Sequence, residues 1–319
     1  MQINMIFLSN YRLVIKPSDI KKKDNILSIL EINQQKEFTH YMICEMNRLR
    51  IKQESIFYRE NNIYFSVFEQ RNEFDWYEHT FGIPAEHKTG LLKMSVEDNK
   101  IKLYNDFGEL SFYSVIQFLE HLNQVLAFND DLKRILSLNV RYIGQTELNL
   151  KYIRFDGHEK ILEVTSEIID NKPNKEAWII LFNFNIPICN SFIGSGIEGN
   201  FRNDWLPDGT LINDLPKKDW KNIVEGALIN YYQPKLNRHF KDNFPSNTHI
   251  SYKYFYNKDI RSIIVELKGE YSSYFLGNEE VKYTQSTLIQ YSLKSIDNNV
   301  FLLDNNEQNI DTLIKVLGD

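Results

Sequence analysis

The chain has few cysteines, no apolar run of membrane length and no excess of positive charge. Its two cysteines, Cys44 and Cys189, are too few for a disulfide framework or a zinc site, which predicts a reducing compartment. One of the longest apolar runs, AWIILF at 177–182, is far shorter than the roughly 20 residues of a membrane helix and indicates a buried strand. The first ten residues show neither the basic region nor the small-residue cleavage site of a secretory signal. These absences predict a cytoplasmic protein.

The net charge of −6 excludes a global positive field that would draw the chain to nucleic acid or to an anionic membrane. Phosphate binding would therefore depend on local groups of basic residues. A hydrophobic share of 42% and an aromatic share of 13% predict a folded globular protein, because such a chain can bury enough apolar surface to offset its entropy. A length of 319 residues favours two packed units.

Two kinds of periodicity define the expected elements. In the first 130 residues, 61–69 is rich in β-branched and aromatic residues and predicts a strand, whereas 112–128 has apolar residues at helical spacing. The later order is a strand at 139–146, a helix near 153–170, a strand at 177–184 and a helix between Pro216 and Pro234. We therefore predict an α+β fold with three parts: an N-terminal α/β region (1–130), a small mixed αβ module (131–245) and a C-terminal antiparallel β extension (246–319).

The segment YIGQTELNLKYIRFDGH at 142–158 contains residues suited to phosphate chemistry. Gly144 removes a side chain where a backbone or a phosphate could come close. Arg154 and His158 are four residues apart, so a helix that begins by Ile153 would present both on one face. Arginine offers a planar fork to phosphate oxygens, and histidine exchanges a proton near neutral pH.

A second segment, EGALINYYQPKLN at 225–237, supplies a carboxylate. Glu225 lies at the edge of the apolar stripe of its helix, where a half-buried carboxylate could hold a hard divalent cation. Its neighbour one turn earlier is Lys221, and lysine before glutamate is the weaker orientation for a helix salt bridge. A purely stabilising role for this pair is therefore less persuasive.

These two segments resemble the motifs of the GIY-YIG nuclease family, over roughly residues 138–240. The matches are Tyr142-Ile143-Gly144, Arg154 with His158, and Glu225 with Leu228-Ile229, Pro234 and Asn237. The resemblance implies phosphodiester hydrolysis with one Mg²⁺ or Mn²⁺ held by Glu225. It also implies a tyrosine-associated base and an arginine that steadies the phosphate.

The first motif of the family, a Gly-Ile-Tyr strand about one hairpin before YIG, is missing at its usual place, which DDLKRILSLN occupies. Tyr64 on the predicted strand 61–69 is the nearest look-alike, and Tyr104 is another. We predict that a strand from the N-terminal region, with Tyr64 as the first choice, pairs beside the Tyr142 strand. If it does not, the base would be His158 or a metal-bound water.

The functional hypothesis is a metal-dependent endonuclease that acts on DNA in preference to RNA, with a role in restriction or defence against foreign DNA by analogy alone. The alternative is an inactive module that binds nucleic acid or a protein partner, and self-association through residues 1–130 is also open. A net-acidic protein must concentrate its positive charge at the contact face. The residues assigned to that face are Lys151, Arg154, Lys235, Arg238 and Lys241. Substrate binding is assigned to Gly144, Lys151, Lys235, Asn237 and Arg238.

Other motifs are weaker. GSGIEG at 194–199 fits a dinucleotide-binding fingerprint, but no helix pattern follows it, so a loop is expected. Asp208, Glu266 and Lys268 imitate another nuclease superfamily at an unsuitable separation, and they are the alternative if Glu225 is not the metal ligand. His79 and His87 lack acidic or cysteine partners at ligand spacing, which favours surface or packing roles.

Overall fold

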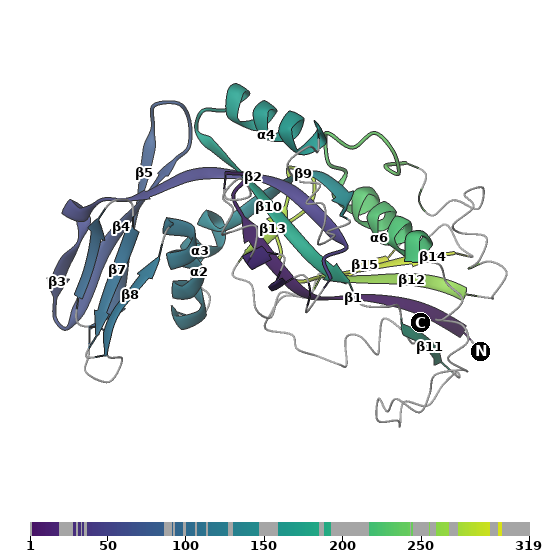
Figure 1. Cartoon of the computed structure of the whole chain (residues 1–319), viewed down its shortest axis with the longest axis horizontal. Coiled ribbons are helices and arrows are strands. Elements are labelled where there is room, and N and C mark those ends of the chain that lie inside the picture. The colour runs from purple at the N-terminus through teal and green to yellow at the C-terminus, as the bar shows by residue number, and fades with distance from the viewer. Residues whose placement is uncertain are drawn as a thin grey trace.

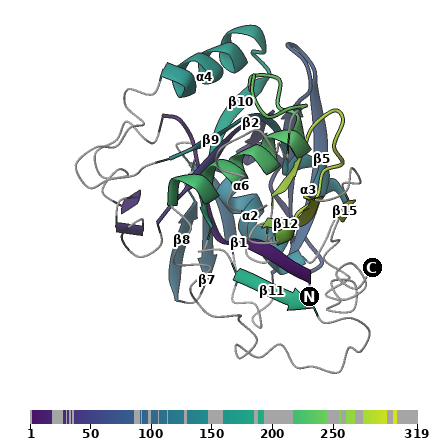
Figure 2. The same ribbon diagram turned by 90° about the vertical axis from the view of Figure 1, so that its right-hand side faces the viewer.

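The structure is a computed structural model of the whole chain, viewed in Figures 1 and 2. The residues that it describes are 2–18, 28–29, 31–32, 34, 37–85, 91, 93–97, 100–105, 107–112, 114–126, 130–146, 159–184, 188–192, 217–242, 244, 255, 260–267, 274–293 and 299–301.

A single mixed sheet of 12 strands dominates the molecule (Figure 1). Eight strands follow one another across it in the order β13-β9-β2-β10-β1-β12-β14-β15. In that order their bounds are Phe275–Gly277, Ser137–Gln145, His40–Ile51, Lys175–Phe184, Gln2–Ile15, Ile260–Leu267, Thr287–Ser292 and Asn299–Phe301. Beside this path, β11 (Ile188–Phe192) pairs with β1.

Strand β2 is the centre of an antiparallel group, with β9 on one side and β10 on the other. Its first seven residues are all buried, because helices cover both faces of the sheet here. On one face, Tyr41 and Ile43 pack with the apolar side of α4 (Glu159–Asn171). On the other face, Met42 and Cys44 share a core with α6 (Lys217–Tyr232). No helix in the described part of the chain is long and apolar enough to cross a membrane.

The far half of β2 continues into a ribbon at one end of the molecule (Figure 1). There β2 pairs with β4 (Asn62–Gln70), which also pairs with β3 (Phe57–Arg59) and β5 (Trp76–Pro84). A short 3-10 helix, η2 (Gln53–Ser55), joins β2 to β3.

The inner face of this ribbon belongs to the main core, where the rings of Phe65 and Phe118 meet edge to face at 5.2 Å. Phe118 lies on α2 (Val115–Leu126), which α3 (Asp130–Ile135) follows. A separate antiparallel sheet adjoins the ribbon and consists of β6 (Lys93–Glu97), β7 (Lys100–Asn105) and β8 (Gly108–Phe112). The phenol of Tyr58 links the ribbon to β6, because it accepts a 3.0 Å hydrogen bond from the Met94 amide.

The predicted fold class was wrong: the chain does not form a small α+β module with separate flanks. Strands from all three predicted parts enter one sheet, since β1 and β2 come from 1–130, β9 and β10 from 131–245, and β12 to β15 from 246–319. The C-terminal strands are also not purely antiparallel, because β12 runs parallel to β1 and β13 parallel to β9. The physical reason is that the central strand β2 buries both of its faces along its first seven residues. Such a strand shows no alternation of apolar and polar residues, so the pattern did not predict it.

Candidate active site

The candidate site begins with the register of β2 and β9. Tyr41 lies opposite Gly144, and Ile43 lies opposite Tyr142. A Cβ atom on Gly144 would approach the Cζ and Oη atoms of Tyr41 to 2.8 Å, which is closer than two carbon atoms can come without displacement. Gly144 is therefore required because the buried Tyr41 ring lies directly over its backbone.

Tyr41 and Tyr142 form a pair of phenols on the face that α4 covers. Their ring centroids are 6.0 Å apart, so the two rings are neighbours across the strand pair. Burial raises the pKa of Tyr41, and the neighbouring Tyr142 raises this pKa further. Burial and the charge of Glu225 also raise the pKa of Tyr142. Both phenols are therefore neutral near pH 7.

Glu225 lies on α6 and reaches the end of β9, where Gln145 follows Gly144. Its negative charge raises the pKa of both phenols, so it lies within electrostatic range of them. Gln145 Nε2 donates a 2.7 Å hydrogen bond to Glu225 Oε2 and another 2.7 Å bond to Asn222 Oδ1. Burial raises the pKa of Glu225 to about 7, against the smaller opposite effect of the Gln145 bond. Near neutral pH the carboxyl is thus poised between its two protonation states.

A buried histidine fixes α6 against the sheet beneath the site. His40 Nε2 lies 2.9 Å from the Lys221 carbonyl oxygen, and Nδ1 lies 2.9 Å from the Thr39 hydroxyl. Because a carbonyl can only accept, we assign the proton to Nε2. Burial lowers the pKa of His40 to about 3, so this imidazole is neutral near pH 7 and acts as a positioning group. Lys221 Nζ lies 3.8 Å from Glu37 Oε1, so the lysine on this turn of α6 forms its ion pair with Glu37.

Asn237 binds the Tyr142–Gly144 segment on the edge of β9 that faces away from β2. Its side-chain Oδ1 accepts a 2.9 Å hydrogen bond from the Ile143 amide, and its Nδ2 donates a 2.8 Å bond to the Ile143 carbonyl. The turn that carries Asn237 begins directly after α6 ends at Tyr232. Its first residue, Gln233, has a left-handed φ of 47°. Sequence analysis assigned Asn237 to substrate binding, whereas its two side-chain bonds are used to complete the edge of β9.

The structure brings together Tyr142, Gly144, Glu225 and Asn237 from the predicted set. Tyr41, and not Tyr64, is the tyrosine that pairs beside Tyr142. Tyr64 lies on β4, stacked on Phe57 with ring centroids 5.1 Å apart, and the other alternative, Tyr104, lies on β7.

The predicted basic face is only partly described. Lys235 is exposed and forms a 3.1 Å ion pair with Glu279, Arg238 is exposed, and Lys241 is half-buried. Outside the described residues lie Lys151, Arg154 and His158, together with 194–199, His87, Asp208 and Lys268.

Two residues of the weaker motifs are described, and neither joins the site. Glu266 lies on β12, far along the sheet order from β9. His79 is buried on β5, and its Nε2 lies 2.9 Å from Glu69 Oε2, an acidic neighbour that its spacing in the sequence did not predict.

The donor set suits a cation that is held by one carboxylate and not by a closed protein cage. No group of three or more histidine, cysteine, aspartate or glutamate residues that could hold a metal occurs within the described ranges. Glu225 is half-buried next to the neutral amide of Gln145, and its Oε1 accepts no hydrogen bond from the described residues. Mg²⁺ characteristically binds through one or two carboxylates and completes its shell with water and substrate phosphates. Glu225 fits that mode of binding.

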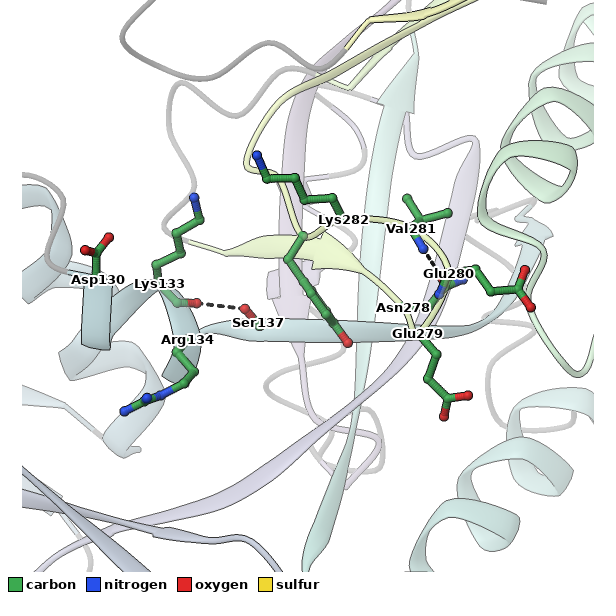
Figure 3. Close-up of a pocket in the computed structure, with 10 residues that line it drawn as sticks. Asp130, Lys133, Arg134, Ser137, Asn278, Glu279, Glu280, Val281 and Lys282 are labelled. Atoms are coloured by element: carbon green, nitrogen blue, oxygen red, sulfur yellow. Dashed lines mark hydrogen bonds between the residues drawn. The ribbon is translucent and has the colours of Figure 1, made fainter.

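A hollow in the described surface lies elsewhere and lacks this chemistry. It measures about 390 Å³ and lies between α3 and the turn at 278–283 (Figure 3). Its lining carries three cationic side chains, Lys133, Arg134 and Lys282, and three carboxylates, Asp130, Glu279 and Glu280. These charges balance, and none of the residues of the tyrosine and glutamate cluster contributes to it.

Sequence analysis missed three residues of the site, namely Tyr41, Gln145 and Asn222. Tyr41 stands in the apolar run THYMICEM, which has no Gly-Ile before the tyrosine. The signal that could have identified Tyr41 is the length of this run, which suits a strand buried on both faces. Such a strand lies in the middle of a sheet, where it could pair with the strand that carries Tyr142-Ile143-Gly144. Gln145 and Asn222 are recognised only through their shared hydrogen bonds.

The comparisons with other proteins leave the site to be interpreted from its own geometry. No protein-family model matches the chain, and neither a characterised protein nor a solved structure is significantly similar to it.

Proposed function

We propose that this chain is a metal-dependent endonuclease that hydrolyses phosphodiester bonds in nucleic acid, DNA in preference to RNA. The observation that carries the proposal is the pair of phenols Tyr41 and Tyr142, with ring centroids 6.0 Å apart, and the half-buried carboxyl of Glu225 that Gln145 holds at the end of the same strand β9. The resemblance of YIG and of the Glu225 segment to GIY-YIG nucleases supports it. The proposal concerns this centre and does not restore the small α+β fold.

The two phenols differ in their exposure. Tyr41 is buried, whereas Tyr142 is half-buried and is the phenol that a water molecule could approach. A water molecule that attacks phosphorus would pass a proton to Tyr142 Oη in its ionised form, so that the phenolate becomes a phenol, while the water oxygen forms the new bond to phosphorus and the ester oxygen departs and takes a proton from solvent. Because burial raises the pKa of Tyr142, its ionised form would depend on the positive charge of a cation held at Glu225. Tyr41 keeps its proton, because burial raises its pKa as well.

Glu225 is the residue that would hold the cation. A divalent cation bound there would supply positive charge that stabilises the phosphate and the leaving oxygen. Gln145 fixes the carboxylate through Oε2, and His40 fixes the helix that carries it. The raised pKa means that proton and cation compete for the same carboxylate, so cation affinity should rise with pH through about 7.

The test is cleavage of a panel of plasmid and oligonucleotide DNA and RNA by the full chain with Mg²⁺ or Mn²⁺. Wild type is expected to cleave, and Glu225→Gln and Tyr142→Phe are each expected to lose at least about 100-fold in rate. Tyr41→Phe removes the neighbouring hydroxyl and should cost less than Tyr142→Phe. Tyr104→Phe is the matched control, because it removes the same hydroxyl from a half-buried tyrosine on β7, outside the site, and should cleave as wild type does.

Each result bears on a specific step. If Tyr41→Phe is the more damaging change, the proton acceptor is Tyr41. If Glu225→Gln cleaves as well as wild type, the cation assignment is wrong. If wild type cleaves nothing in the panel but binds nucleic acid, the chain is the non-cleaving binding module, and the nuclease proposal is wrong.

A further inference from the structure

The outer face of the ribbon carries aromatic and cationic side chains in place of the usual polar ones. Cross-strand register puts Arg50, Phe68 and Glu78 on one face of β2, β4 and β5, and it puts Phe57, Tyr64 and Gly82 on the same face. We define the aromatic face as the following residues: Arg50, Lys52, Phe57, Tyr64, Phe68 and Trp76.

The rings of this face reach solvent, although two polar residues on the same side of β4, Ser66 and Gln70, are buried. Phe57 is 47% exposed and Trp76 36% exposed, while Tyr64 and Phe68 are half-buried. The alternating residues Phe65 and Val67 are fully buried beneath them against α2. A sheet that buries one face normally presents polar residues on the other, so a row of large rings there indicates a binding surface.

The cations of the aromatic face lie directly over its rings. The guanidinium of Arg50 is 4.9 Å from the centre of the Trp76 ring, and Lys52 Nζ is 4.7 Å from the centre of Phe68. Phe57 and Tyr64 are stacked with an angle of only 11° between their planes. Flat rings with adjacent cations match the two repeating parts of a nucleic-acid strand, since bases stack on aromatic rings and phosphates attract cations.

We propose that the aromatic face binds an unpaired strand of nucleic acid. The charge balance favours this partner, because Arg50, Lys52 and Arg59 outnumber Glu78 on the face, and Arg59 is partly compensated by Glu60 at 3.2 Å. A locally positive surface on a chain of net charge −6 is suited to a polyanion. The strand must be unpaired, because the faces of bases inside a duplex are already stacked on their neighbours.

This inference rests on the proposed function and extends it to substrate recognition. Tyr41 and Arg50 belong to the same strand, nine residues apart, so they are separated by about 30 Å along an extended backbone. A substrate with an unpaired flank could therefore contact the aromatic face while its scissile phosphate lies at Tyr142 and Glu225. The preferred substrate class is then nucleic acid that has a single-stranded segment near the cut.

The experiment is fluorescence anisotropy with labelled oligothymidylate of about 15 nucleotides, which covers the site size of typical single-strand binders. Metal is chelated, and the full chain carries Glu225→Gln so that cleavage cannot interfere. Trp76→Ala is expected to bind about tenfold more weakly, because loss of one stacked base costs roughly that much. Arg50→Gln should reduce the slope of log affinity against log salt by about 0.7. Phe107→Ala is the control, because Phe107 is 95% exposed but lies in the turn before β8.

The outcomes separate this inference from the nuclease proposal. Binding that depends on Trp76 but not on Phe107 supports the aromatic face, even if wild type proves unable to cleave. If wild type fails to bind the oligonucleotide, or Trp76→Ala binds it as wild type does, the inference is wrong whatever the cleavage result. Self-association that Trp76→Ala abolishes, without any strand binding, would show that a second copy of the chain occupies this face.

Discussion

The two ends of β2 put the same kinds of side chain to opposite uses. At Tyr41 the strand lies between two helices, its tyrosine and histidine are buried, and the neighbouring carboxyl of Glu225 is half-buried. At Arg50 only one face of the strand is covered, and the rings of Phe57 and Trp76 on the other face are exposed to solvent. Burial of polar groups at the first end shifts their pKa values, which is a property of reactive sites. Exposure of aromatic groups at the second end leaves contact area available for a ligand.

The largest difference between the ends is expected for their asparagines. Asn237→Ala removes two hydrogen bonds and leaves the buried Ile143 amide and carbonyl without partners, so unfolding should become easier by about 3 kcal/mol. Asn62→Ala is the matched change in the ribbon, where the asparagine makes an exposed bond to the Glu60 carbonyl and should cost under about 0.5 kcal/mol. Chemical denaturation of both variants measures the difference. Equal losses would mean that Asn237 does not hold the YIG segment.

The carboxyls of the two ends should respond to pH in opposite directions. The pKa of Glu225 is raised from 4.5 to about 7, so the folded chain retains this proton longer than the unfolded chain. Wild-type stability should therefore fall as the pH rises from about 4.5 to about 7, and Glu225→Gln should remove that loss, on the order of 2 kcal/mol above pH 7. Added Mg²⁺ should stabilise wild type and not Glu225→Gln.

Glu69 in the ribbon gives the opposite sign. Burial alone would raise its pKa, but hydrogen bonds from Asn47, His79 and Arg71 outweigh burial and lower it. Its ionised form therefore stabilises the fold above pH 4.5, and this contribution is lost as the pH falls through the lowered pKa. Glu69→Gln should thus be less stable than wild type near neutral pH, where Glu225→Gln is more stable. Thermal unfolding across the pH range tests both slopes, and the same sign for both variants would contradict the contrast.

The smallest expected difference concerns two glycines with the same local geometry. A Cβ on Gly144 would lie 2.8 Å from the Tyr41 ring, and one on Gly82 would lie 2.8 Å from the Tyr64 ring. Tyr41 is buried and cannot move aside, so Gly144→Ala should cost about 1 to 2 kcal/mol, as overpacking does. Tyr64 is half-buried and can rotate toward solvent, so Gly82→Ala should cost less.

Cleavage rates sharpen this comparison of glycines. Gly144→Ala should displace the Tyr41 hydroxyl from Tyr142 and reduce the rate at a temperature where the variant is still folded. Gly82→Ala should leave the rate unchanged. If the two variants cleave alike, the contact between Tyr41 and Gly144 has no role in positioning the phenols.

Local patterns predicted individual elements better than their assembly. The expected strand at 61–69 is observed as β4, the expected strand at 177–184 lies within β10, and the second expected helix is α6. These segments carry their own signal, because helical spacing, β-branched residues and stopping prolines act over a few residues. The number of strands in the sheet was not predictable in the same way, since pairing joins β1 with β12 across most of the chain.

The sequence by itself determined four residues of the site. Tyr142 and Gly144 stand in one short segment, and Glu225 and Asn237 stand in another, each recognisable from the spacing of its residues. Only the tertiary structure decided that Tyr41 completes the site, because β2 and β9 are separated by residues 52–136, which form the ribbon, the small sheet and two helices. Register across a sheet is set by burial of both strands together, and no local pattern encodes it. The raised pKa of Glu225 is likewise a consequence of what surrounds the carboxyl, and a glutamate in a sequence carries no record of its surroundings.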